Sequence, residues 1–160
     1  MTQTVDGPVE NAAVPGIVGV DHVGLAVPDL TAAVHLHTAM LGGWVEHQEE
    51  NAEQGVTEVM IAFDGGTRVQ LLSPTSPDSP VGRFLASRGP GMHHLAYRVS
   101  DIGRAATALR ARGMRLLSDT DRLGTAGSRI LFVHPRDAGG VLVELVQAAP
   151  TDQVGTVGAS

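Results

Sequence analysis

Cysteine and lysine are both absent from this 160-residue sequence. Without cysteine, the chain can form no disulfide, thiolate metal site or cysteine nucleophile, so a metal site would have to use His, Asp, Glu or Gln. Without lysine, Schiff-base chemistry, a pyridoxal lysine and a phosphate-loop lysine are excluded. We therefore expect a soluble protein, located in the cytoplasm.

Aromatic residues and long apolar runs are also scarce. The chain has one Trp, one Tyr and three Phe, and no apolar stretch approaches the roughly twenty residues of a membrane span. It contains no Gly-x-Ser-x-Gly elbow, Walker loop, dinucleotide fingerprint or secretory signal pattern. We expect no membrane association and none of the chemistries that these motifs carry.

The net charge of −6 is unevenly distributed. Residues 1–74 hold ten acidic residues and one arginine, whereas residues 75–160 hold seven acidic residues and ten arginines. An acidic chain of this kind is not expected to bind nucleic acid. Residues 1–15 and 148–160 lack hydrophobic periodicity and are predicted to be disordered tails around one domain, residues 16–147.

An internal repeat is the most informative feature of the domain. The segment DHVGLAVPDL at 21–30 aligns, at an offset of 72, with HHLAYRVSDI at 93–102, and His22 falls on His94. Each copy starts with a strand-like run of apolar and small residues. An aspartate suited to a helix N-cap follows in each copy, ahead of an apolar stripe with helical spacing.

The two predicted helices end at glycines, Gly42-Gly43 and Gly113. Strands are expected after the first helix at 44–50, 56–63 and 68–72, and after the second at 114–118, 128–133 and 141–147. The fold class is therefore α+β, with two tandem βαβββ modules at about 16–74 and 91–147. They are joined by a linker at 75–90 that contains a short helix. Because a curved sheet cannot bury its concave face alone, the two sheets should pair around a shared cleft.

Four polar residues occupy equivalent places in otherwise apolar strands. His22 and His94 lie in the first strand of each module, and Gln70 and Glu144 lie in the last. Burying such groups without partners costs about 1–3 kcal/mol each. Two imidazoles, an amide oxygen and a carboxylate would together suit a divalent metal ion. A lone histidine is more often a structural residue, and Gln70 could face solvent. The internal repeat nevertheless favours the metal site. Its alignment also selects His94, rather than His93, as the ligand.

Glu58 is the one ionisable residue in its predicted strand. It could be a surface carboxylate on an edge strand. When Ile61-Ala62-Phe63 is aligned with Ile130-Leu131-Phe132, however, the counterpart of Glu58 in the second module is Gly127. Glu58 therefore has no equivalent carboxylate and breaks the internal symmetry. This makes Glu58 a candidate for chemistry. The acidic run 46–53 is predicted to be a solvated face, and the glycine-rich turn at 124–129 is only a weak anion-binding signal.

At these residues the sequence resembles the vicinal oxygen chelate superfamily and, within it, the methylmalonyl-CoA epimerase family. The resemblance spans about 16–147. It rests on the strand motifs around His22, Gln70, His94 and Glu144 and, most specifically, on EENAEQGVTE at 49–58. It implies a metal site at His22, Gln70, His94 and Glu144, and a catalytic glutamate at Glu58.

The resemblance also implies the reaction, which is interconversion of the (2R) and (2S) forms of methylmalonyl-CoA. Glu58 would be one base, and Glu144 would combine metal binding with the role of second acid. Because a ligating carboxylate is a poorer base than a free one, a metal-bound water or another group is the alternative for the second role. The acyl-CoA phosphates would suit arginines of the second half. The metal is expected to be cobalt(II), with manganese(II), nickel(II) and zinc(II) fitting the same ligands, and the protein is expected to be a homodimer.

Two other functions remain open from the sequence. One is a glyoxalase I-like isomerase or lyase acting on a glutathione hemithioacetal, against which glutamine at position 70 counts mildly. The other is a non-enzymatic, antibiotic-sequestering protein of the same fold, whose cleft would usually be rich in aromatic residues. This chain has few of them.

Overall fold

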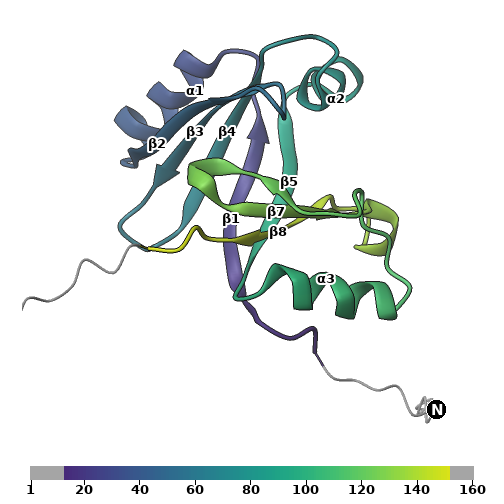
Figure 1. Cartoon of the computed structure of the whole chain (residues 1–160). Coiled ribbons are helices and arrows are strands. Elements are labelled where there is room, and N and C mark those ends of the chain that lie inside the picture. The colour runs from purple at the N-terminus through teal and green to yellow at the C-terminus, as the bar shows by residue number, and fades with distance from the viewer. Residues whose placement is uncertain (1–12, 152–160) are drawn as a thin grey trace, which may run out of the picture.

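The computed structural model describes residues 13–151, so most of both predicted tails, 1–12 and 152–160, lies outside the described residues. One strongly curved, mixed sheet of eight strands runs through both halves in the order β2-β3-β4-β1-β5-β8-β7-β6 (Figure 1). The predicted α+β architecture of two βαβββ modules around a shared cleft is confirmed. None of the described helices is long and apolar enough to cross a membrane.

The first module follows the predicted order closely. Its elements are β1 (Ile17–Ala26), α1 (Leu30–His35), which continues as a π-helical turn (Leu36–Met40), β2 (Trp44–Asn51), β3 (Val56–Ala62) and β4 (Arg68–Pro74). Asp29 caps α1 by accepting from the Ala32 N–H, as expected. The helical segment ends at Gly42, whose positive φ of 79° suits glycine.

The linker contributes α2 (Pro80–Arg88), which confirms the short helix predicted there. The second module then contains β5 (Gly91–Val99), α3 (Ile102–Ala111), β6 (Arg122–Leu123), β7 (Arg129–Val133) and β8 (Val143–Gln147), with short 3₁₀ turns at Thr125–Gly127 and Pro135–Asp137. Asp101 caps α3 by accepting from the Arg104 N–H, and Gly113 follows the helix with a φ of 76°.

The strand predicted at 114–118 is wrong. Only Leu116 forms an isolated bridge there, to Val133, and regular pairing resumes at the two-residue β6. The intervening run is Ser-Asp-Thr-Asp, and such side chains often bond to local backbone instead of supporting a ladder. The Ser118 hydroxyl, for example, donates to the Thr120 carbonyl at 2.8 Å.

The two modules meet edge to edge in the middle of the sheet. β1 pairs antiparallel with β5, and each of these central strands pairs parallel with the last strand of its own module, β4 or β8. The pairing places Ala96 opposite His22 and His94 opposite Gly24. The two histidines therefore lie close together, on adjacent strands at the centre of the curve.

Two helices cover the outer face of the sheet, and the apolar core lies beneath them. Under α1, Val59, Ile61 and Leu71 are almost fully buried. Under α3 the core comprises a longer cluster, namely Val99, Ile102, Ala105, Ala106, Leu109, Leu131, Val133 and Leu145, and Val14 packs against it from the segment predicted to be a tail. The concave face carries the polar residues together with a smaller apolar cluster packed against α2, namely Ala26, Val56, Leu72 and Val81.

Candidate active site

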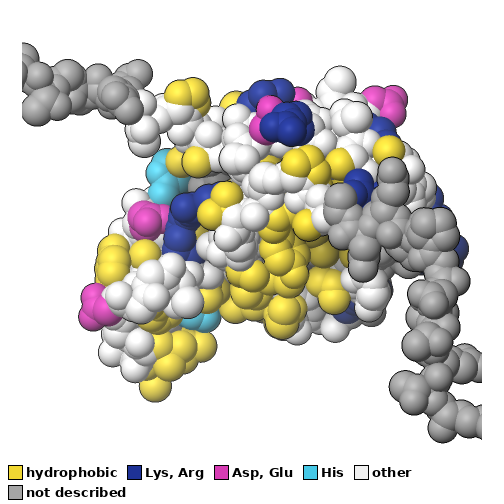
Figure 2. Space-filling view, turned by 90° about the horizontal axis from the view of Figure 1, so that it is seen from below, with side chains coloured by type: hydrophobic (Ala, Val, Ile, Leu, Met, Phe, Trp, Pro, Cys, Tyr) yellow, Lys and Arg dark blue, Asp and Glu magenta, His cyan; other side chains and the backbone are white. Residues whose placement is uncertain are grey.

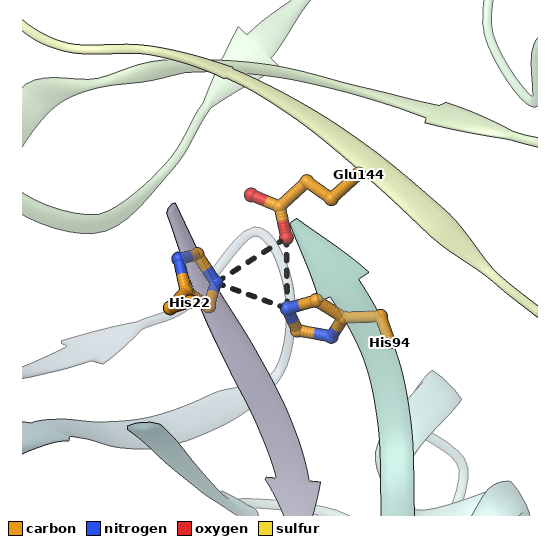
Figure 3. A group of neighbouring side chains, drawn as sticks. All are labelled: His22, His94 and Glu144. Carbon is orange, nitrogen blue, oxygen red and sulfur yellow. Dashed lines mark hydrogen bonds and ion pairs between the residues drawn. The ribbon is translucent and has the colours of Figure 1, made fainter. Parts of the chain in front are cut away.

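Three buried ligand-type side chains converge at the centre of the concave face. His22 comes from β1, His94 from β5 and Glu144 from β8 (Figure 3). The His94 Nε2 atom lies 2.9 Å from Glu144 Oε2 and 3.2 Å from His22 Nε2. One ligand atom from each residue falls within 4.8 Å of the others. Two imidazole nitrogens and a carboxylate oxygen at this spacing suit a divalent metal ion.

The place of the His94 ring depends on a glycine. A Cβ atom built on Gly24 would lie 2.2 Å from His94 Cε1, far closer than van der Waals contact. At the equivalent place in the other module, opposite His22, the sheet carries Ala96. A side chain at position 24 would require the His94 ring to shift from its place in the cluster.

Asp21 supports His22 from behind the cluster. Its Oδ2 lies 2.8 Å from His22 Nδ1, and its Oδ1 accepts from Arg98 at 2.8 Å, with Arg68 at 3.4 Å. Burial alone would raise the pKa of Asp21, but these hydrogen bonds and positive charges lower it to about 2. Asp21 is thus a fixed carboxylate behind one histidine.

His93 supports His94 in a similar position. Its Nδ1 lies 3.0 Å from His94 Nδ1, and its ring contacts Phe84 edge-on. Burial, with the neighbouring His94, lowers the pKa of His93 to about 4, so the ring is neutral at physiological pH. The alignment's choice of His94 for the cluster agrees with the structure. Neighbouring residues on a regular strand face opposite sides of the sheet, but His93 also lines the cavity.

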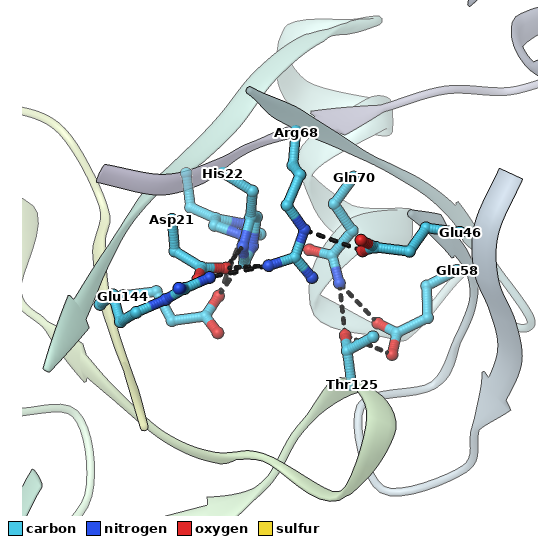
Figure 4. A network of polar contacts seen from close by, with 10 residues as sticks. Asp21, His22, Glu46, Glu58, Arg68, Gln70, Thr125 and Glu144 are labelled. Atoms are coloured by element: carbon cyan, nitrogen blue, oxygen red, sulfur yellow. Dashed lines mark hydrogen bonds and ion pairs between the residues drawn. The ribbon is translucent and has the colours of Figure 1, made fainter. Parts of the chain in front are cut away.

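A second polar network lies beside the cluster and centres on Glu58 (Figure 4). The Thr125 hydroxyl donates to Glu58 Oε1 at 2.7 Å, and the Gln70 amide donates to Glu58 Oε2 at 3.0 Å. Burial, together with the carboxylates of Glu49 and Glu144, raises the pKa of Glu58 to about 7, although the Thr125 hydroxyl acts in the opposite direction. A carboxylate with a pKa near neutrality is suited to general base chemistry.

The amide oxygen of Gln70 is buried and has no hydrogen-bond partner among the described residues. Its amide nitrogen is fully used by Glu58 and Thr125, so the oxygen remains available. An unpaired buried acceptor is unfavourable by about 1–3 kcal/mol unless something binds it. The chemistry of the donor set therefore fits a metal ion, with an amide oxygen in addition to two histidines and a carboxylate.

His22 lines a separate cavity of about 420 Å³, and one cavity connects the other groups to the outside. Glu58, Gln70, His94 and Glu144 all line it, together with Thr125. Two adjoining cavities, of about 400 and 190 Å³, share His93 with it and contain one arginine each, Arg88 and Arg122. The site thus opens from a buried polar centre towards guanidinium groups.

Comparisons with known proteins agree with this geometry. The model of the glyoxalase/bleomycin resistance protein/dioxygenase superfamily matches residues 21–132. Human mitochondrial methylmalonyl-CoA epimerase is 40% identical over 129 residues, which cover 80% of this chain and 73% of that protein. The crystal structure of methylmalonyl-CoA epimerase from Mycobacterium tuberculosis superimposes with a TM-score of 0.83 at 46% identity, covering 87% of this chain and 93% of that one.

The chain belongs to the methylmalonyl-CoA epimerase family. A further family structure, of the epimerase in complex with methylmalonyl-CoA and NH4+, has a TM-score of 0.80 at 46% identity and covers 83% of this chain and 96% of that one. The resemblance noted from the sequence motifs is therefore confirmed over most of the chain.

Within this family framework, the structure corrects the sequence alignment around Glu58. Met60 pairs with Gln70, and Phe132 pairs with Glu144, so the true counterpart of Glu58 is Ile130 rather than Gly127. The alignment was three residues out of register because it matched similar apolar triplets, whereas hydrogen bonding sets the pairing. Glu58 still breaks the symmetry, since its counterpart is apolar.

Sequence reasoning missed two contributors to the site. Thr125 belongs to the glycine-rich turn that gave only a weak signal, and the turn brings its hydroxyl to Glu58 and Gln70. Glu49 was assigned to a solvated face, but it pairs across the sheet with Glu58 and accepts from the Ala126 N–H at 3.2 Å. The signal for Glu49 was its place in the motif at 49–58.

Proposed function

We propose that this protein interconverts the (2R) and (2S) forms of methylmalonyl-CoA by removing and returning the proton at C2. The observation that carries the proposal is a buried carboxylate, Glu58, whose pKa is raised to about 7 and which shares one cavity with His94 and Glu144. Relatives named methylmalonyl-CoA epimerase, about 40% identical over most of the chain, support the choice of substrate.

We further propose His22, Gln70, His94 and Glu144 as ligands of one divalent metal ion, with cobalt(II) expected before manganese(II), nickel(II) or zinc(II). When bound, the ion supplies positive charge next to the substrate oxygen that becomes negative as the C2 proton leaves. The convergence of His22, His94 and Glu144 and the unpaired amide oxygen of Gln70 support this ligand set.

The chain's own residues then divide the proton transfers. The Glu58 carboxylate takes the C2 proton, and the electron pair of the C–H bond moves into the thioester carbonyl. Glu144, on β8, is proposed to hold the proton that returns to the opposite face. Thr125 and Gln70 fix the Glu58 carboxylate by donating to its two oxygens at 2.7 and 3.0 Å. The base is therefore pre-oriented towards the cavity.

The coenzyme A part of the substrate is proposed to extend through the adjoining cavities. Arg88 and Arg122 line these cavities, and guanidinium groups match phosphate oxygens in geometry and charge. We also propose that the protein takes part in propionate metabolism and is located in the cytoplasm. Fractionation of cells expressing the full chain would check the location.

We also propose that the protein is a homodimer. Figure 2 shows hydrophobic side chains gathered in the middle of the lower face, the side on which β1 begins. In that half of β1, Val18 and Val20 are 66% and 59% exposed. Exposed apolar side chains gathered on one face are typical of an interface.

A charge on this surface should separate the subunits. We expect Val20→Glu to shift the mass measured by light scattering from that of a dimer to that of a monomer. The control is Val45→Glu, at a valine of β2 that is 44% exposed. A dimer unchanged by Val20→Glu would contradict this surface, and a monomeric wild type would contradict the dimer itself.

The decisive test of function is proton NMR of methylmalonyl-CoA in deuterated water. We expect the C2 proton signal to disappear rapidly with cobalt-loaded protein, and slowly, near the no-protein rate, after chelation. Exchange that is no faster than without protein would contradict the proposal. In that case formation of lactoylglutathione from the hemithioacetal would be assayed next.

A further inference from the structure

The residue immediately before each central histidine contacts that histidine's Nδ1 atom. Asp21 Oδ2 lies 2.8 Å from His22 Nδ1, and His93 Nδ1 lies 3.0 Å from His94 Nδ1. These two preceding residues align with each other in the internal repeat. The same supporting contact to a histidine Nδ1 therefore occurs twice. A carboxylate makes it in one module, and an imidazole makes it in the other.

Two β-bulges explain how these neighbours reach the same histidines. In the β1–β5 ladder the pairing passes from Val20 to His22 and omits Asp21. On the other strand it passes from His94 to Met92 and omits His93. At a β-bulge the side chain no longer follows the regular alternation between the two faces of the sheet, so it can point in a different direction. Each bulge thus turns the preceding side chain towards the adjacent ring.

The chemistry of imidazole determines which atom donates and which accepts in each of these contacts to Nδ1. Both histidines turn Nε2 towards the cluster, where the two Nε2 atoms lie 3.2 Å apart. A histidine that binds metal through a neutral Nε2 carries its hydrogen on Nδ1, which then needs an acceptor. For His22 the acceptor is the Asp21 carboxylate. For His94 the group in contact with Nδ1 among the described residues is His93 Nδ1, which would accept if His93 carries its own hydrogen on Nε2.

We propose that His93 is a positioning residue that fixes the ring orientation and tautomer of His94, as Asp21 does for His22. This inference rests on the metal site of the proposed function. The two supports differ in strength. Asp21 is anchored by Arg98 and Arg68, whereas His93 is held by packing against Phe84, with ring centroids 5.0 Å apart. His94 is accordingly the less strongly polarised ligand of the two.

The test measures cobalt(II) affinity by competition with a chromophoric chelator, together with the visible spectrum of the bound cobalt. We expect His93→Leu, which retains bulk but accepts no hydrogen bond, to bind cobalt about 10–100-fold more weakly and with an altered spectrum. His93→Asn should recover most of the affinity, because its amide oxygen can take the place of Nδ1. The control is His35→Ala, at an exposed histidine on α1.

Nitrogen-15 NMR of the zinc-loaded protein gives a second readout. We expect His93 to carry its hydrogen on Nε2 and His94 on Nδ1. Unchanged affinity and spectrum in His93→Leu, or a hydrogen on Nδ1 of His93, would overturn the inference and leave the proposed function intact. Wild-type protein that binds no metal would overturn both, and His94→Ala provides the reference for a lost ligand.

Discussion

Glu58→Gln is expected to reduce C2 proton exchange by at least about 10²–10⁴-fold while the protein still binds one metal ion per chain. The amide retains the shape of the side chain, and it can accept from the Gln70 amide through its oxygen while its NH2 donates to the Thr125 oxygen, but it cannot accept a proton from carbon. Exchange is measured by NMR and bound metal by elemental analysis. Glu53→Gln, at an exposed glutamate of the same motif, is the matched control.

The same substitution should also stabilise the metal-free protein, in a pH-dependent manner. Because burial raises the pKa of Glu58 from 4.5 to about 7, the folded state holds its proton more tightly than the unfolded state. Wild-type protein should therefore lose stability relative to Glu58→Gln as the pH rises from about 4.5 to about 7, and the difference should stay constant above that.

Thermal unfolding in the presence of a chelator, at pH 4.5 and pH 8, measures this difference. A higher Tm for Glu58→Gln at pH 8, with a smaller gap at pH 4.5, is the expected result. Undiminished proton exchange in the variant would rule out Glu58 as the base. An equal gap at both pH values would show that its carboxyl group titrates normally.

Gly24→Ala is expected to weaken metal binding by more than the roughly 10–100-fold typical of losing a supporting contact. The added methyl group would lie 2.2 Å from His94 Cε1 and 2.6 Å from its Nε2, so the ring must shift from its present place in the cluster. Gly24 has an ordinary extended backbone conformation, which alanine also adopts. The effect should therefore come from the lost ligand and not from backbone strain.

Gly91→Ala is the matched control, because a Cβ atom there meets no described atom within 4 Å. If Gly24→Ala folds poorly, the double variant with His94→Ala should unfold at a higher temperature than Gly24→Ala alone, since the methyl group then has room. Metal affinity in Gly24→Ala equal to that of the wild type would show that His94 is not a ligand.

Local sequence was sufficient for much of the fold. The aspartate N-caps, the glycines that end the helices and the apolar strands each act over a few residues, and the repeat placed His22 and His94 at matching positions. The strand predicted at 114–118 is reduced to one bridge at Leu116, and beyond it the Arg110 side chain, rather than a neighbouring strand, donates to the carbonyls of Ser118 and Asp119. The motif at 49–58 identified Glu58 as a candidate base before any contact was known.

The sequence by itself determined which residues have the chemistry for the site: two histidines, a glutamine and two glutamates in strands that the repeat relates. Only the tertiary structure decided how they are supported. The bulges at Asp21 and His93 and the turn that brings in Thr125 depend on hydrogen bonds between segments far apart in the chain. Those hydrogen bonds form only when the sheet assembles, so no local pattern encodes them.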